Sequence, residues 1–119
     1  MSTPHAHTPP LLQRRSHAWI DARSLALAEA VAEKIRRDPA LLRRAAGNLA
    51  RWKRLKGTLP PCLKEWEEIL AGRTMDDVLA ILVEDNEQGR RRRQSSPFTG
   101  LLTPAERKVI FQRYEAIGA

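Results

Sequence analysis

The sequence predicts an all-α protein, a small bundle of about five helices that follows a disordered N-terminal tail. Apolar residues recur at steps of three and four along most of the chain, which is the spacing of one helix face. No stretch of useful length alternates apolar and polar residues as a half-buried strand does. At 119 residues the chain suits one small domain. We therefore expect a tail over residues 1–16 and a single helical domain over residues 17–119.

The tail and the first helix differ sharply in composition. Residues 1 to about 15 are polar and rich in proline, so they have little apolar surface to bury and disfavour a helix. His5 and His7 form a His-x-His pair, but a metal site would need further ligands nearby, so we expect none. The first helix is expected over about residues 17–37, with an apolar stripe formed by Leu27, Val31 and Ile35.

Two further helices are expected in the middle of the chain. The second covers about residues 39–56, with Asp38 as its N-cap and Pro39 at its first position, and it ends at Gly57. Its inner face is expected to carry Leu42, Ala45, Leu49 and Trp52. The third is a short helix that starts at Pro60 or Pro61 and ends at Gly72, with Leu63, Trp66 and Ile69 or Leu70 on one face.

Capping signals predict the last two helices. Thr74 and Asp77 resemble a capping box with Asp in place of Glu, and they start a fourth helix over about residues 75–86. Thr103 and Glu106 form a full capping box with Pro at the first position, and they start the last helix. Residues 84–104, EDNEQGRRRRQSSPFTGLLTP, are then expected to connect the two helices, either as a solvated linker or as a surface that meets a partner.

The basic and acidic residues are separated along the chain, which has a net charge of +7. Such a charge permits binding to nucleic acid, to acidic protein or to an anionic surface. The second helix contains six basic residues and no acid from position 43 to 56, and eight acids follow between positions 64 and 87. One interpretation is that these helices attract each other within the domain, where exposed ion pairs contribute roughly 0–1 kcal/mol each. The other is a nucleic-acid site formed by Arg43, Arg44, Arg51, Lys53, Arg54 and Lys56.

The arginine run at positions 90–93 invites a different interpretation. Four adjacent like charges repel and cannot all lie on one helix face, so stability does not explain them. Arginine offers forked donors to carboxylate or phosphate, which favours a partner-contact patch over a plain solvated run. Phe98 then either inserts into a partner pocket or folds back over its own helix ends. The predicted partner-binding residues are Arg90, Arg91, Arg92, Arg93, Ser95, Ser96, Pro97 and Phe98.

The chemistry-bearing motifs of enzymes are absent from the sequence. It contains no glycine-rich phosphate loop and no paired Cys/His metal spacing, and all three histidines lie within the first 17 residues. We therefore expect no enzyme, no cofactor and no metal site. Cys62, the single cysteine, is expected to be a small packing residue. No segment has the length and apolarity of a signal sequence or membrane span, which predicts a cytoplasmic protein.

Three segments taken together resemble a group of small bacterial proteins. These are RSLALAEAVAEKIR, a middle segment centred on tryptophan, and VEDNEQGRRRRQSSPFTGLLTPAER, over roughly residues 22–117. The group is similar to the antitoxin half of two-gene toxin–antitoxin modules. The resemblance implies a helical protein that binds and inhibits a toxin encoded beside it, with repression of its own operon as an additional role. It assigns no residue a role, and a nucleotidyltransferase or a ribonuclease would both suit as the toxin.

The rival hypothesis is a DNA- or RNA-binding regulator that uses the basic second helix and the arginine run. The connection KGTLPP after that helix is a poor match to the short turn of a helix-turn-helix. The partners expected are thus a toxin protein encoded nearby and, in the rival hypothesis, operator DNA. No membrane partner is expected, and a homo-oligomer is left open.

Overall fold

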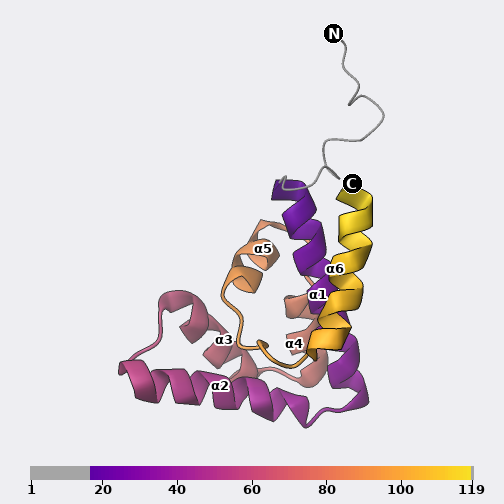
Figure 1. Ribbon diagram of the computed structural model, residues 1–119. Helices are drawn as coiled ribbons and strands as arrows, with labels where there is room; N and C mark the ends of the chain where they lie inside the picture. The colour runs from indigo at the N-terminus through magenta and orange to yellow at the C-terminus, as the bar shows by residue number, and fades with distance from the viewer. Residues whose placement is uncertain (1–16, 119) are drawn as a thin grey trace.

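The computed structural model describes residues 17–118, and this part of the chain contains six helices and no strand (Figure 1). The helices are α1 (His17–Arg37), α2 (Leu41–Lys56), α3 (Pro61–Gly72), α4 (Met75–Leu82), α5 (Glu87–Gln94) and α6 (Pro104–Gly118). The all-α prediction is confirmed, and the number of helices is six instead of five. The tail predicted over residues 1–16 lies outside the described residues.

The first and last helices form an antiparallel pair along one side of the molecule (Figure 1). Trp19 near the start of α1 donates from Nε1 to the carbonyl oxygen of Tyr114 in α6 at 3.0 Å. The two rings also meet edge to face, with their centroids 6.4 Å apart. Farther along the pair, Lys34 Nζ lies 2.7 Å from Glu106 Oε1 and 2.8 Å from the carbonyl oxygen of Leu101. These contacts join the two ends of the described chain.

One hydrophobic cluster joins residues of α1, α2, α3, α4 and α6 with the loop between α5 and α6. The predicted stripe of α1 is confirmed in part, because Val31 and Ile35 are buried and Leu27 is half-buried. Trp66 of α3 is fully buried, and its ring meets that of Phe98 edge to face at 5.2 Å. Its Nε1 donates to the carbonyl oxygen of Arg92 at 2.9 Å. A single tryptophan thus connects α3, α5 and the following loop.

Of four predicted helix ends, three agree with the structure and one does not. The Thr103–Glu106 capping box is confirmed in both directions, with distances of 2.7 and 3.1 Å between the backbone nitrogens and the side-chain oxygens. Thr74 accepts from the backbone nitrogen of Asp77 at 3.2 Å, which confirms the start of α4. Gly57 ends α2 with a φ of 82°, a left-handed conformation that favours glycine. The predicted Asp38 cap is wrong, because α2 begins at Leu41 without a side-chain cap.

The larger correction concerns residues 83–94. The fourth helix ends at Leu82 instead of about residue 86, and a separate helix, α5, covers Glu87–Gln94. The signal for its start is present in the sequence, since Asn86 accepts from the backbone nitrogen of Gly89 at 2.8 Å in the manner of an N-cap. The arginine run therefore belongs to a helix and not to a connection.

Candidate functional site

The arginine helix α5 lies unusually close to the turn that precedes it. A Cβ atom placed on Gly89 would lie 1.9 Å from the carbonyl oxygen of Glu84, a separation that no side chain can tolerate. Gly89 is therefore required for α5 to fold back onto the end of α4. This close return carries the arginines to the acidic side chains of the neighbouring helices.

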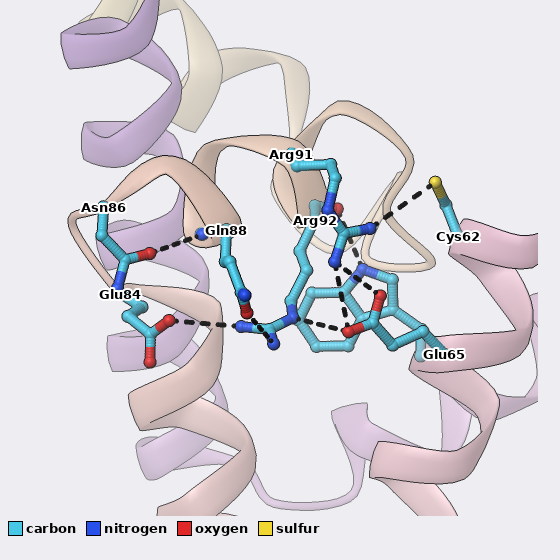
Figure 2. Close-up of polar contacts among 9 residues, drawn as sticks. Cys62, Glu65, Glu84, Asn86, Gln88, Arg91 and Arg92 are labelled. Carbon is cyan, nitrogen blue, oxygen red and sulfur yellow. Dashed lines mark hydrogen bonds and ion pairs between the residues drawn. The ribbon is translucent and has the colours of Figure 1, made fainter.

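Two of the arginines share one carboxylate of α3 (Figure 2). Arg91 Nη2 lies 3.0 Å from Glu65 Oε1, and Arg92 Nε lies 3.0 Å from Glu65 Oε2. Arg92 also reaches Glu84 Oε1 at 3.2 Å, and only 15% of its side chain is exposed. The hydrogen bond from Arg92 is the main reason that the pKa of Glu65 is lowered, since it favours the charged carboxylate. Arg92 thus acts as a clamp between α3 and the α4–α5 turn.

The other two arginines contact different elements. Arg90 Nε lies 3.7 Å from Asp21 Oδ2 of α1. Arg93 Nη1 donates to the carbonyl oxygens of Leu82 and Glu84, at 3.0 and 2.8 Å, where α4 has ended. Helical geometry spreads the four side chains around the axis, and each direction holds an acceptor. The run is therefore largely used inside the molecule, and its role in binding a partner stays a prediction.

The segment after the run is also turned inward. Pro97 and Phe98 are buried, and Ser95 and Ser96 are half-buried. Ser96 Oγ accepts from the backbone nitrogen of Phe98 at 3.1 Å, which holds the turn. The fold-back alternative for Phe98 is confirmed, and the proposal that its ring enters a partner pocket is wrong, because Trp66 and the core already enclose it.

The basic residues of α2 have a different environment. All six of them are exposed: Arg43, Arg44, Arg51, Lys53, Arg54 and Lys56. Among the described residues only Lys53 reaches an acid, Glu67, at 3.5 Å. The attraction expected between the basic second helix and the acidic third is therefore limited to one exposed pair. The remaining charge of α2 is not neutralised within this part of the chain.

Helices α2 and α3 are a poor match to a helix-turn-helix, but for a reason other than the one predicted. The connection to α3 covers residues 57–60 and is as short as such turns are. The obstacle is the next helix, because the exposed side of a recognition helix must meet DNA phosphates and bases. Instead, α3 contains Glu65, Glu67 and Glu68.

A groove of about 690 Å³ lies where α2, α6 and the loop before α6 meet. Its walls contain Arg44 of α2 and Arg107 and Lys108 of α6, none of which pairs with a carboxylate among residues 17–118. The apolar part of the lining includes Phe111, Pro104, Leu101 and Leu102. This mixture of cationic and apolar lining distinguishes the groove from the outer side of α2.

Asn48 fixes the loop that forms one wall of this groove, and sequence reasoning missed it. Its Nδ2 donates to the carbonyl oxygens of Pro97 and Thr99, at 2.9 and 3.2 Å. Arg44 Nη2 donates to the carbonyl oxygen of Gly100 at 3.4 Å. The loop is thus held against α2 by hydrogen bonds from side chains of α2 to its backbone carbonyls, which no sequence pattern predicts.

The comparisons with known proteins identify no relative: no family model, curated protein or solved structure matches this chain. Within the described residues no group of three or more His, Cys, Asp and Glu side chains is arranged to hold a metal ion. None of the helices described is long and apolar enough to cross a membrane.

Proposed function

We propose that this protein is an antitoxin-like binding subunit that inhibits an enzyme encoded beside it by covering that enzyme's surface. In this proposal it works in the cytoplasm and has no catalytic activity of its own. The observation that carries the proposal is the groove beside α2 and α6, which is lined by apolar side chains and by three cations without a carboxylate partner in the described chain. The resemblance to antitoxins supplies the kind of partner.

The composition of the groove favours a protein partner. Interfaces between proteins combine a buried apolar centre with polar surroundings, and aromatic residues and arginine contribute most of their binding energy. Phe111 and Leu101 give the groove an apolar lining, and Arg44 and Lys108 give it charge. An acidic segment with a few apolar side chains would match both features.

The wall of the groove also contains the segment that carries the resemblance. Gly100, Leu101, Leu102, Thr103 and Pro104 line it directly. Bonds from Asn48 and Arg44 hold this wall in place before any partner arrives. Such preorganisation reduces the entropic cost of binding, which supports a binding role for the segment.

Co-expression with the product of the adjacent gene tests the proposal. We expect that product to stop growth alone, to be tolerated with this protein, and to co-purify with it. The double variant Arg44→Glu/Lys108→Glu should lose both protection and co-purification. The matched control is Lys64→Glu/Arg73→Glu, which makes the same charge change at two exposed residues away from the groove. Protection that survives in Arg44→Glu/Lys108→Glu, or that is lost equally in the control, would reject the groove as the binding site.

A second candidate function is nucleic-acid binding, and the unneutralised charge of α2 favours it. Arg43 and Arg54 lie on the exposed side of the helix together with Ala46, Gly47 and Ala50. These small residues would let a phosphate backbone approach the helix closely. An antitoxin that represses its own operon would use both surfaces.

A mobility-shift titration on the protein's own promoter DNA separates this candidate from the first. Neutralising Arg43 and Arg54 with Gln should weaken binding and reduce the salt slope by about 0.9 for each phosphate that is no longer bound. The control Lys64→Gln/Arg73→Gln removes the same charge at two exposed residues outside α2 and should leave the slope unchanged. Affinity that does not vary with salt would exclude the nucleic-acid function.

A further inference from the structure

Arg93 differs from the three arginines before it because no carboxylate lies within ion-pair distance of it in the described chain. Its Nη1 makes both of its hydrogen bonds, and both go to backbone carbonyls. Its Nε is covered by the protein and has no acceptor there. The edge of the guanidinium formed by Nε and Nη2 is therefore not used by the fold.

A half-buried cation with an unused donor is costly. Burial lowers the pKa of Arg93, because removing water disfavours its charged form. Leaving a buried N–H without an acceptor costs about 1–3 kcal/mol. Native structures contain few such groups, and each calls for an explanation. Asp85, Asp21 and Glu29 act on Arg93 only from beyond ion-pair distance, so a bound anion would supply both the missing acceptor and a direct ion-pair partner.

The same residue lines a cavity of about 310 Å³ between α1 and the loop that leads to α6. A second cation, Arg107, also lines the cavity, as do the hydroxyl-bearing residues Ser24, Ser96 and Thr99. Much of the remaining lining is apolar: Leu27, Val31, Phe98 and Leu102. The volume is at the lower end of the range for small-molecule sites.

We propose that this cavity is a binding site for an aliphatic carboxylate held by the free edge of Arg93. Two parallel N–H groups match the two oxygens of a carboxylate in a bidentate pair. The apolar lining matches an aliphatic chain, which inorganic phosphate lacks. Because Nε is covered, lining side chains must move apart before a carboxylate can reach it, and this rearrangement weakens binding.

The site is distinct from the groove proposed to bind the partner, although the two share Arg107, Gly100 and Leu102 on either side of one loop. The carboxylate comes either from a free aliphatic acid or from the C-terminal residue of a peptide chain. Both present the same chemistry to Arg93, and the choice of probe distinguishes them.

Titrations followed by ¹H–¹⁵N NMR test this site with hexanoate and with N-acetyl-leucine, which mimics a C-terminal residue. We expect saturable shifts of the Arg93 Nε–H signal and of the amides of Ser24 and Thr99. N-acetyl-leucinamide and inorganic phosphate should cause no saturable shift. Tighter binding of N-acetyl-leucine identifies a peptide terminus, and tighter binding of hexanoate identifies a free acid. Equal binding of the amide, or no saturable shift with either acid, overturns the proposal.

Two variants locate the binding within the cavity. Arg93→Lys keeps the positive charge but removes the two parallel N–H donors of the guanidinium, so we expect the affinity for the carboxylate to fall at least tenfold. The control Arg91→Lys, on the same helix, should bind the carboxylate like wild type. Arg93 also holds the end of α4, so a second variant, Ser24→Leu, fills the cavity from α1 and leaves Arg93 intact. We expect Ser24→Leu to abolish the shifts while the rest of the spectrum stays folded. Unchanged binding in Ser24→Leu places the acid elsewhere and overturns the site.

Discussion

The arginine run of α5 and the basic face of α2 are similar in sequence and opposite in structure. Both are dense in positive charge and lack acids among the basic residues. In α5, three of the four arginines pair with carboxylates of α1, α3 and the α4–α5 turn. In α2, the exposed pair Lys53–Glu67 is the only ion pair that the helix makes within the described chain. A charged run therefore indicates a binding surface only when the fold leaves it without partners.

The two regions also differ in how strongly their charges stabilise the fold. Arg92 is 15% exposed and bridges two carboxylates, and hydrogen bonds to charged groups in such a setting contribute about 1.5–3 kcal/mol. Lys53 and Glu67 are 53% and 40% exposed, and exposed pairs contribute roughly 0–1 kcal/mol. We thus expect α5 and its following loop to be sensitive to substitution and α2 to be tolerant. Three experiments test this contrast in order of decreasing effect, and a fourth tests a carboxylate outside both regions.

The largest effect is expected from removing the aromatic ring that closes the α5 loop. Phe98→Ala should destabilise the protein by about 3–5 kcal/mol, because it leaves a cavity beside Trp66. The matched variant Leu55→Ala in α2, at a side chain that is 75% exposed, should change stability by less than about 0.5 kcal/mol. Urea unfolding monitored by circular dichroism measures both. Similar losses of unfolding free energy in Phe98→Ala and Leu55→Ala would contradict the expectation that the α5 region is sensitive to substitution and α2 is tolerant.

A pair of glycine substitutions tests the close return of α5. Gly89→Ala should cost roughly 3 kcal/mol, since its Cβ would overlap the carbonyl oxygen of Glu84. Gly47→Ala in α2 places its Cβ in open space on a helix and should stabilise the protein by about 0.5–1 kcal/mol. Thermal unfolding midpoints should move in opposite directions. A tolerated Gly89→Ala would mean that α5 does not pack against the turn.

A double-mutant cycle measures the coupling energy between Arg92 and Glu65. We expect Arg92→Met to destabilise the protein by about 1.5–3 kcal/mol, mainly because it removes its charge-assisted hydrogen bonds. Adding Glu65→Gln should cost less in that background than in wild type, giving a measurable coupling energy. Arg54→Met in α2 serves as the control and should be nearly neutral. Strictly additive effects at Arg92 and Glu65 would show that the two side chains do not interact in solution.

The smallest expected effect is on how stability depends on pH. The hydrogen bond from Lys34 and the capping contact with Thr103 lower the pKa of Glu106 from 4.5 to about 2, and the pKa of Glu65 is lowered as well. A lowered pKa in the folded state stabilises the protein above pH 4.5, and this contribution is lost as the pH falls toward 2. Glu106→Gln should therefore differ from wild type at pH 7 and converge with it near pH 2.

Urea midpoints at the two pH values measure the convergence. Glu68→Gln, at an exposed position of α3, is the control and should follow wild type throughout. A difference between Glu106→Gln and wild type that persists near pH 2 would show that the carboxylate acts through its shape and not its charge.

Sequence reasoning succeeded where the relevant partners are neighbours along the chain. The capping boxes at Thr74 and Thr103 depend on atoms of residues that are three positions apart. The apolar stripes of the helices depend on a repeat of three to four residues. The same local reasoning missed α5, because four arginines in a row suggested a solvated connection, and the cap at Asn86 was overlooked. It also overestimated Asp38, where the helix begins three residues later.

The sequence by itself determined the all-helical class, most helix boundaries and the presence of two basic regions. Only the tertiary structure decided which of those regions is available to a partner. Arg91 lies 26 residues from Glu65 in sequence, and Trp66 lies 32 residues from Phe98, yet each pair is in contact. Periodicity and capping describe interactions within a few residues, whereas the compensation of a charge depends on acids brought from elsewhere by the packing of the core. For that reason the fold class could be predicted, and the exposed cations of α2 and the unpaired Arg93 could not.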